Sequence, residues 1–393
     1  MKILFYRYGS ICEPDLVECF RGADIEVEEE KSQMTNKATT PAEVVESLSK
    51  RFDLNKYLFV FSINFFPAVS EICQVYGIPY VCWTVDSPVM ELFSDSLRNS
   101  VNRVFFFDRA QYEYFGKDLS NCFYLPLATN VGRWQQVINS ATHTEKARFQ
   151  SDISLVGSLY SEKNPYRNIK GLSDWARGYV DGLVKSQMNI FGYNFIEGAL
   201  NDRVMSEFEK NVPDLNAGPY AGKLSKKYVM ANNFIGMELA YKERVEYLNA
   251  LAEVGTVDLY TFSDTSELRG VHVHDKGVKT LTEMPLVFNQ SKINLNITIR
   301  PIQTGLSLRV FDVMGCGGFL MTNYQAELPE YFDIGVDLEA FSSKEELVDK
   351  AGYYLQHDDE RQKIAISGYE KVSKYHTYAH RFAQMIKLIL EAV

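Results

Sequence analysis

The sequence predicts two Rossmann-like, doubly wound α/β domains that face a cleft. The chain has 393 residues, which fits two domains at roughly 100 to 200 residues each. Its composition, 46% hydrophobic and 23% charged, is that of a globular protein with sizeable cores. Short apolar runs alternate with helical patterns in two separate stretches of the chain, and this alternation is typical of βαβ units with a parallel sheet.

The first domain is expected over residues 1–140. Residues 1–9 contain a short apolar run but neither the long apolar core nor the small-residue cleavage site of a leader peptide, so they are interpreted as a first strand. The expected strands are residues 3–6, 58–62, 80–85, 104–107 and 122–125, and the expected helices are residues 14–21, 42–51, 67–76 and 109–115.

The second domain is expected over residues 151–375, after the polar segment 139–151, which lacks a strong apolar period and is interpreted as the boundary. Residues 164–251 are helical but irregular and are interpreted as an insertion, and residues 376–393 as a helix that returns to the first lobe. The other expected elements are strands at 153–156, 257–261, 293–296, 319–322 and near Val336, and helices at 283–290, 307–315, 327–331, 344–356, 358–375 and 379–392.

The formal net charge of −10 argues against a nucleic-acid partner, because binding to a phosphate backbone requires clustered Lys and Arg. The richest apolar stretch, residues 57–69, is too short to span a bilayer, so only peripheral membrane contact is left open and a cytoplasmic location is expected. The six cysteines form no CxxC pair, so neither a disulfide framework nor a zinc site is expected.

Loops directly after strands carry the candidate chemistry, since ligands of open α/β sheets bind at the carboxyl ends of the strands. Tyr8 and Gly9 follow the first strand and form the candidate acceptor-facing loop. Glu13 and Asp15 come next, and we interpret them as acidic residues favoured at a helix start. Asp86 follows the strand at residues 80–85, where it either acts as a general base or caps a helix that begins near Pro88.

Two further loops belong to the second domain and suit a phosphorylated ligand. Gly157 and Ser158 follow the strand at 153–156 and are suited to line a diphosphate, with Lys163 as a point charge. Gly305 and Leu306 precede the helix at 307–315, whose free N–H groups and dipole favour a phosphate.

Arg309 and Asp312 lie three residues apart on this helix and hence on one face. We assign Arg309 to the phosphate and Asp312 to ribose hydroxyls, against the alternative of an intrahelical ion pair. Asn323 follows the next strand, where it either bonds sugar hydroxyls or serves a turn. The histidines form no metal pattern and no Asp-x-Asp motif follows a strand, so no obligatory metal or cofactor is expected.

Several of these segments resemble the CgeB-like glycosyltransferases, which are related to the group 1 GT-B enzymes. The resemblance rests on residues 291–296, 308–319 and 376–381, and more loosely on 83–88. It implies a GT-B architecture in which the second lobe binds a nucleoside diphosphate sugar and the acceptor approaches from the first.

The same resemblance places Asp312 where the group 1 enzymes have a ribose-binding Glu, and Lys163 where they have a phosphate-binding Lys. The sequence departs from that pattern at Ser158, in place of an Arg, and at Thr304, in place of the first Glu of a paired signature. Arg309 is a candidate for the missing charge. Retention or inversion stays open, and Asp86 is the candidate base for an inverting reaction.

The sequence thus predicts a nucleotide-sugar-dependent glycosyltransferase that transfers a sugar to a hydroxyl of a glycan, a protein or a cell-surface polymer precursor. Two alternatives remain: a two-lobed binding protein for a small molecule, and a GT-B-like subunit without activity that partners an active homologue. The absence of an export signal and the Arg309/Asp312 helix argue against the first, whereas the missing acid at Thr304 leaves the second open.

Overall fold

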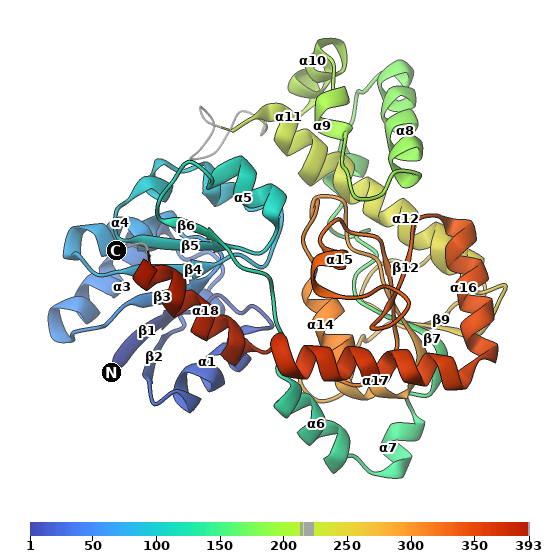
Figure 1. Cartoon of the computed structure of the whole chain (residues 1–393). Helices are drawn as coiled ribbons and strands as arrows, with labels where there is room; N and C mark the ends of the chain where they lie inside the picture. Colours follow the sequence, from blue (N-terminus) through green and yellow to red (C-terminus); the bar gives the residue numbers. More distant parts are fainter. Residues whose placement is uncertain (213–214, 216–223, 392–393) are drawn as a thin grey trace. The chain divides into compact units, whose positions relative to one another are not determined.

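In the computed structural model the chain divides into two compact units, and the structure describes residues 1–212, 215 and 224–391. Unit 1 comprises Met1–Ala128 and the C-terminal segment that begins at Tyr378, and unit 2 comprises Thr129–Thr377. Each unit holds one six-stranded sheet in which all neighbouring strands are parallel (Figure 1). The prediction of a doubly wound α/β fold is therefore confirmed.

The sheet of unit 1 has the strand order β2-β1-β3-β4-β5-β6. Its strands are β1 (Lys2–Tyr6), β2 (Glu26–Glu30), β3 (Val60–Ile63), β4 (Tyr80–Trp83), β5 (Asn102–Phe106) and β6 (Cys122–Tyr124). Its helices are α1 (Glu13–Gly22), α2 (Ser32–Thr35), α3 (Pro41–Leu54), α4 (Pro67–Tyr76), α5 (Arg109–Phe115) and α18 (Tyr378–Glu391), with 3-10 turns at Met90–Phe93 and Asp95–Arg98.

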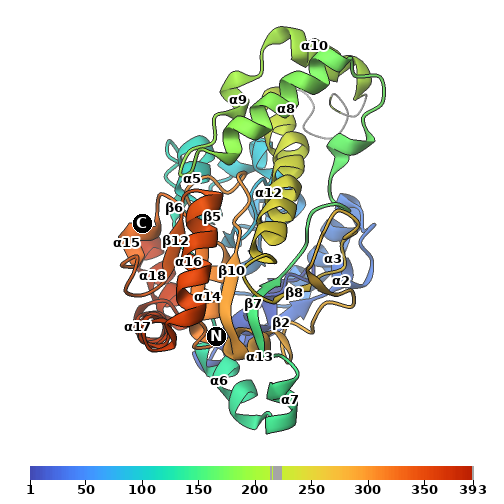
Figure 2. The ribbon, with the colours of Figure 1, turned by 90° about the vertical axis from the view of Figure 1, so that its right-hand side faces the viewer.

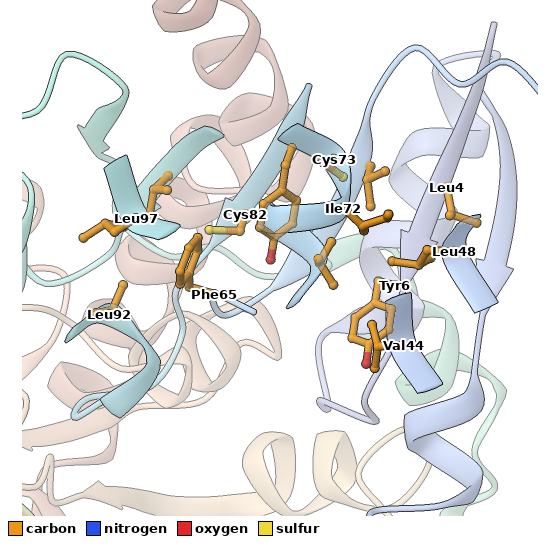
Figure 3. Packing of buried hydrophobic residues seen from close by; sticks show 14 of the residues in the cluster. Leu4, Tyr6, Val44, Leu48, Phe65, Ile72, Cys73, Cys82, Leu92 and Leu97 are labelled. Atoms are coloured by element: carbon orange, nitrogen blue, oxygen red, sulfur yellow. The ribbon is translucent and has the colours of Figure 1, made fainter. Parts of the chain in front are cut away.

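Successive side chains of these strands are buried on opposite faces of the sheet, because side chains alternate between the two faces along a strand. Leu4 and Tyr6 of β1 pack with residues of α3 and α4 in one core (Figure 3). Phe5 lies on the other face, where its ring contacts Phe20 of α1, which in turn contacts Phe382 of α18. The segment 378–391 therefore belongs to the core of unit 1.

Strand β2 has no counterpart among the expected elements, because its sequence, EVEEE, carries four glutamates. It pairs only with β1, at the edge of the sheet. Its carboxylates form ion pairs with Lys2, Arg7 and Arg51. Lys31, directly after the strand, also pairs with Glu29. Because four of the five residues are glutamates, the local pattern lacks the apolar residues that indicate a strand.

The sheet of unit 2 has the order β12-β11-β10-β7-β8-β9. Its strands are β7 (Ser151–Val156), β8 (Val257–Tyr260), β9 (His272–His274), β10 (Ser291–Asn296), β11 (Leu320–Asn323) and β12 (Glu339–Phe341). The helices around it are α6 (Val131–Ser140), α7 (His143–Ala147), α13 (Met284–Gln290), α14 (Leu308–Gly315), α15 (Leu328–Tyr331), α16 (Lys344–Gln356) and α17 (Asp358–Tyr375).

A helical subdomain is inserted between β7 and β8 and has its own apolar core, which includes Val180, Phe208 and Met230. Both views show α8 to α11 standing away from the strands of unit 2, with α12 leading back to the sheet (Figures 1 and 2). Its elements are α8 (Asp174–Met188), α9 (Ile196–Ala199), α10 (Asp202–Asn211), α11 (Lys226–Val229), a π-helical turn (Met230–Ile235) and α12 (Gly236–Leu251).

The polar segment 139–151, interpreted above as the boundary, lies inside unit 2, and the division falls earlier, after Ala128. Helix α6 occupies residues 131–140 and buries Trp134 and Ile138. Helix α7 is short and contains no buried residue. A capping box formed by Thr142 and Glu145 satisfies backbone donors of its first turn. Capping rather than apolar period thus defines this helix. Among the described residues, no helix combines the length and apolarity that crossing a membrane requires.

Candidate active site

Each sheet has one point where the chain changes its direction of winding, and ligands of open α/β sheets bind at the carboxyl ends of the strands there. In unit 1, β2 lies on one side of β1 and β3 on the other, so this point lies between β1 and β3. In unit 2, β8 and β10 flank β7, so the corresponding point lies between β7 and β10. The loops after these four strands are therefore the candidate ligand-binding loops.

At the switch point of unit 1, side chains from three loops meet. Asn64, after β3, donates from Nδ2 to Oδ2 of Asp86 at 2.6 Å and to the hydroxyl of Tyr8 at 2.9 Å. The Tyr8 hydroxyl also lies 3.4 Å from the same oxygen of Asp86. The structure thus brings together Tyr8 and Asp86, which the sequence assigned to the acceptor side, and adds Asn64.

Asp86 is exposed, as a carboxylate that meets a substrate must be. The alternative that it caps a helix near Pro88 is wrong, because the next helical turn is the 3-10 turn at Met90–Phe93, whose N-cap is Val89. Burial raises the pKa of Tyr8, and the negative charge of Asp86 adds to this effect. Tyr8 therefore stays a protonated hydrogen-bond donor at neutral pH.

Glu13 has a larger role than that of an acidic residue at a helix start. It is fully buried. Its carboxylate accepts hydrogen bonds from Nε of Arg7 at 3.0 Å, from the backbone N–H of Tyr8 at 2.9 Å and from that of Gly9 at 3.1 Å. Gly9 has a φ of 97°, which a residue with a side chain adopts only at a cost. Glu13 thus fixes the loop that carries Tyr8.

At the switch point of unit 2, the central side chain is Arg244 of α12. Its guanidinium donates to the carbonyl oxygen of Ser158, after β7, and to that of Ile297, after β10, the latter at 2.6 Å. It is only 8% exposed, its Nε has no hydrogen-bond partner, and it forms no ion pair with a described residue. Burial lowers the pKa of Arg244. A buried cation without a paired anion is costly and needs an explanation.

The loop after β7 holds the predicted residues Gly157, Ser158 and Lys163. The Ser158 hydroxyl is engaged within the loop, since it donates to Glu162 at 2.6 Å and accepts from the N–H of Tyr160 at 2.6 Å. Lys163 is exposed, with its Nζ 5.7 Å from the centre of the Tyr160 ring. Lys163 is thus an exposed charge near this loop, whereas Ser158 shapes the loop.

The loop after β10, which leads to Gly305 and Leu306, is held by a buried ion pair. Arg300 is 3% exposed and Glu243 of α12 fully buried, and Nη2 of Arg300 donates to Oε1 of Glu243 at 2.6 Å. Further along the loop, Gln325 donates to the carbonyl of Gly305 at 3.2 Å. These contacts set the approach to α14, whose N-cap, Ser307, makes no side-chain capping bond.

Asn323 is not a sugar ligand in this structure. It is fully buried, its Oδ1 accepts from the N–H of Thr298 at 2.7 Å, and its Nδ2 donates to the carbonyl of Thr298 at 3.0 Å. Both ends of the amide are therefore engaged in fixing the loop after β10. The alternative of a structural role for Asn323 holds.

Arg309 and Asp312 point to different neighbours, although they lie on one helix. Arg309 packs against α13, with its guanidinium 4.8 Å from the ring centre of Phe288 and Nη1 2.8 Å from the sulfur of Met284. Asp312 is 5% exposed, and its Oδ1 accepts from the Thr129 hydroxyl at 2.6 Å. Desolvation lowers the pKa of Arg309, and burial raises that of Asp312. The intrahelical ion pair is absent, and the phosphate and ribose roles stay predictions.

Thr304, which stands in place of an expected acid, has a carboxylate beside it. Its hydroxyl donates to Oε1 of Glu327 at 2.7 Å, and the N–H of Glu327 lies 3.2 Å from the carbonyl of Thr304. Glu327 precedes α15 and is 1% exposed. The acid near this loop thus comes from the segment after β11. Within the part of the chain that the structure describes, no group of three or more His, Cys, Asp or Glu is arranged to hold a metal ion.

Sequence reasoning missed Asn64, Arg244 and Glu327 as site residues. Asn64 gave a usable signal, because a polar residue directly after an apolar strand lies at the carboxyl edge of the sheet. Arg244 gave none, because it sits within a long helix and reaches the edge only through the packing of α12. Glu327 belongs to the polar loop after the strand at 319–322, where the sequence left a role in bonding sugar hydroxyls and a role at a helix start equally open.

The chain is similar to known proteins in sequence family and in fold. Residues 244–387 match a family model described as glycosyl transferase-like. No curated protein matches the chain in sequence.

Two solved structures are similar over the whole chain. One is HepE (Alr3699) from Anabaena in complex with UDP and glucose, with a TM-score of 0.51 and 11% identity over 100% of both chains. The other is sucrose-phosphate synthase (tll1590) from Thermosynechococcus elongatus, with a TM-score of 0.52, 10% identity, and 100% of this chain and 98% of that one covered. These likenesses show a GT-B fold. Together with the family match over residues 244–387, they support the prediction of a glycosyltransferase.

Proposed function

We propose that the chain transfers a sugar from a nucleoside diphosphate sugar to an acceptor hydroxyl, and that unit 2 binds the donor. The observation that carries this proposal is the buried guanidinium of Arg244 at the β7/β10 switch point, where Nε lacks a partner. A second guanidinium, that of Arg309, is also desolvated: burial lowers its pKa, and the nearby charge of Arg244 contributes in the same direction. Two like charges in a desolvated environment favour an anion, and a diphosphate supplies two charges.

The N-terminus of α14 adds backbone donors to these cations. Its N-cap, Ser307, makes no side-chain capping bond, so the first N–H groups are directed at the carboxyl edge of the sheet. Lys163 lies on the neighbouring loop, from which its long side chain reaches over Tyr160. In this proposal Arg244, Arg309, Lys163 and the α14 N-terminus stabilise the departing diphosphate.

The reaction that fits is attack of the acceptor oxygen on the anomeric carbon. The carbon–oxygen bond to the diphosphate breaks, and the nucleoside diphosphate leaves with the bonding electrons. Asp86 of unit 1 takes the proton of the acceptor hydroxyl. We further propose that cations of the protein replace a metal ion in this step, that the chain is a CgeB-like enzyme, and that it acts in the cytoplasm.

Binding of nucleotides tests the donor site directly. UDP, GDP, TDP and CDP are compared by thermal unfolding and calorimetry with wild type, Arg309→Ala and Asp312→Ala, in the presence of EDTA. A ligand at a hundredfold excess over its Kd stabilises the native state by about 2.7 kcal/mol. We expect one nucleotide to stabilise wild type and both variants to lose this shift.

Release of the nucleotide from its sugar conjugates then tests catalysis. We expect wild type to hydrolyse or transfer the donor of the same nucleotide series. Binding without any turnover would favour the alternative of an inactive partner subunit. Absence of binding by all four nucleotides would refute the donor site itself.

A further inference from the structure

Asn64 adopts a backbone conformation that residues with side chains rarely take. Its φ is 57°, in the left-handed region, and it lies directly after β3 at the switch point of unit 1. Asn tolerates this region better than most residues, but the conformation still costs free energy relative to an extended one. Strain of this kind persists where the surrounding contacts impose it, and it gathers at functional sites.

The contacts that impose it tie two loops together. The backbone N–H of Asn64 donates to the carbonyl of Trp83 at 2.9 Å, and its Oδ1 accepts from the N–H of Val85 at 3.0 Å. Its carbonyl accepts from the Ser62 hydroxyl at 2.8 Å. The Asn64 side chain is thus fixed by the hydrogen bond from Val85 to Oδ1, which also fixes the direction of its NH2 group.

That direction is toward Asp86 and Tyr8. Nδ2 donates to Oδ2 of Asp86 at 2.6 Å and to the Tyr8 hydroxyl at 2.9 Å. Among the described residues, the side-chain hydrogen bonds to the Asp86 carboxylate come from Asn64 and Tyr8, and both go to Oδ2. The carboxylate is therefore held by one oxygen, and its other oxygen, Oδ1, is available to a hydroxyl that arrives from solvent.

We propose that Asn64 is a positioning residue that orients Asp86 toward the acceptor hydroxyl, with Tyr8 as the second group at this site. The proposal rests on the proposed function. The site takes a neutral hydroxyl compound, since a carboxylate accepts a hydrogen bond from an alcohol or from water. In its left-handed conformation, Asn64 accepts from the N–H of Val85 through Oδ1 and donates to Asp86 through Nδ2 at the same time.

Hydrolysis of the donor tests this without knowledge of the acceptor, because water then takes the place of the hydroxyl. The rate of nucleotide release is measured from UDP-, GDP-, TDP- and CDP-glucose, and the fastest donor is used. Asn64→Gly keeps the backbone conformation but deletes the amide. We expect kcat to fall about tenfold to a hundredfold, as misplacement of a reacting group does, with the affinity for the nucleotide unchanged.

Asn64→Asp provides the readout that a merely structural role would not give. The variant retains the acceptor for the Val85 N–H but puts a second carboxylate beside Asp86. Since two neighbouring carboxylates resist joint ionisation, the acid limb of the rate profile should move to higher pH. Asp24→Gly is the matched control, because Asp24 has a φ of 56° in the turn after α1, and its rate and profile should equal those of wild type.

Each result decides between the two proposals. Thermal unfolding first establishes that both Asn64 variants are folded. If wild type binds and hydrolyses a donor, and both variants keep the kcat and the pH profile of wild type, the positioning role is refuted and the proposed function stands. If Asn64→Gly fails to fold, the pH profile of Asn64→Asp decides alone. If wild type neither binds nor hydrolyses any donor, the proposed function fails and this inference fails with it.

Discussion

In both units a buried glutamate binds an arginine of the switch-point loop. The two glutamates differ in how many of their hydrogen-bonding positions are occupied. In unit 1, Glu13 is fully buried and accepts from Arg7 and from two backbone N–H groups. In unit 2, Glu243 is equally buried and accepts from Arg300 through Oε1. Its Oε2 is buried and has no hydrogen-bond partner.

The difference shows how each edge is adapted to its ligand. The edge of unit 1 is a hydrogen-bonded network that presents the exposed carboxylate of Asp86, which is suited to accept a hydrogen bond from a neutral hydroxyl. At the edge of unit 2, two buried atoms of charged groups have no hydrogen-bond partner among the described residues, Nε of Arg244 and Oε2 of Glu243. Incomplete satisfaction is costly in the free protein and is relieved when a charged ligand supplies the missing partner.

Removal of the satisfied glutamate should have the largest effect on stability. Glu13→Ala leaves Arg7 without one carboxylate partner and strands the N–H groups of Tyr8 and Gly9, so the free energy of unfolding should fall by about 3–5 kcal/mol. Urea denaturation measures it. Glu46→Ala is the control, because Glu46 and Lys50 form an exposed ion pair, worth about 0–1 kcal/mol. Equal losses in the two variants would contradict the anchoring role.

Removal of the unsatisfied cation should act on the ligand more than on the fold. Arg244→Gln should weaken nucleotide binding by about 1.5–3 kcal/mol, the range for hydrogen bonds to charged groups, which is about tenfold to a hundredfold in Kd. The nucleotide affinity of Arg244→Lys should lie between those of wild type and Arg244→Gln, because an ammonium keeps the charge but lacks the planar arrangement of guanidinium donors. Calorimetry with the nucleotide that binds wild type measures both.

The exposed Arg269, on the loop before β9, gives the matched control. Arg269→Gln makes the same chemical change at the surface and should leave Kd unaltered. An Arg244→Gln protein that is folded and binds the nucleotide as tightly as wild type would show that Arg244 only ties the loops of Ser158 and Ile297 together.

The sequence predicted the parts of the fold that depend on local apolar pattern. The central strands and the helices α1, α3 and α14 fall where apolar spacing placed them. Strand β2 was not predicted because its glutamates give no apolar pattern and are paired with residues such as Arg51 in the folded protein. The boundary was placed too late because α6 and α7 lie in a segment with little apolar period. Elements that tertiary contacts create were thus beyond the reach of local pattern.

The site divides in the same way. Tyr8 and Asp86 were identified because each directly follows a strand, and the parallel sheet then brings such residues to one edge. Asn323 was expected directly after a strand as well, yet it is the last residue of β11 and faces Thr298 inside the protein, and sequence position alone does not distinguish the two orientations. Arg244 reaches the edge from α12, so only the packed structure reveals it.

The smallest effect expected is a change in the pH dependence of stability. Burial raises the pKa of Glu243 above its usual range, with the charge of Arg300 opposing the shift. The native state therefore holds this proton where the unfolded chain has released it, so the free energy of unfolding falls as pH rises from about 4.5 through the pKa of the folded state. Glu243→Gln removes the titration.

Stability curves of the two proteins test this sign. With rising pH over that window, the thermal midpoint of wild type should fall relative to that of Glu243→Gln, and above it the difference should be constant. A midpoint that rises relative to the variant would mean that Arg300 overcomes the desolvation of Glu243. In that case the edge of unit 2 would be held by a favourable ion pair, like that of unit 1, and a bound anion would no longer be needed to account for its charges.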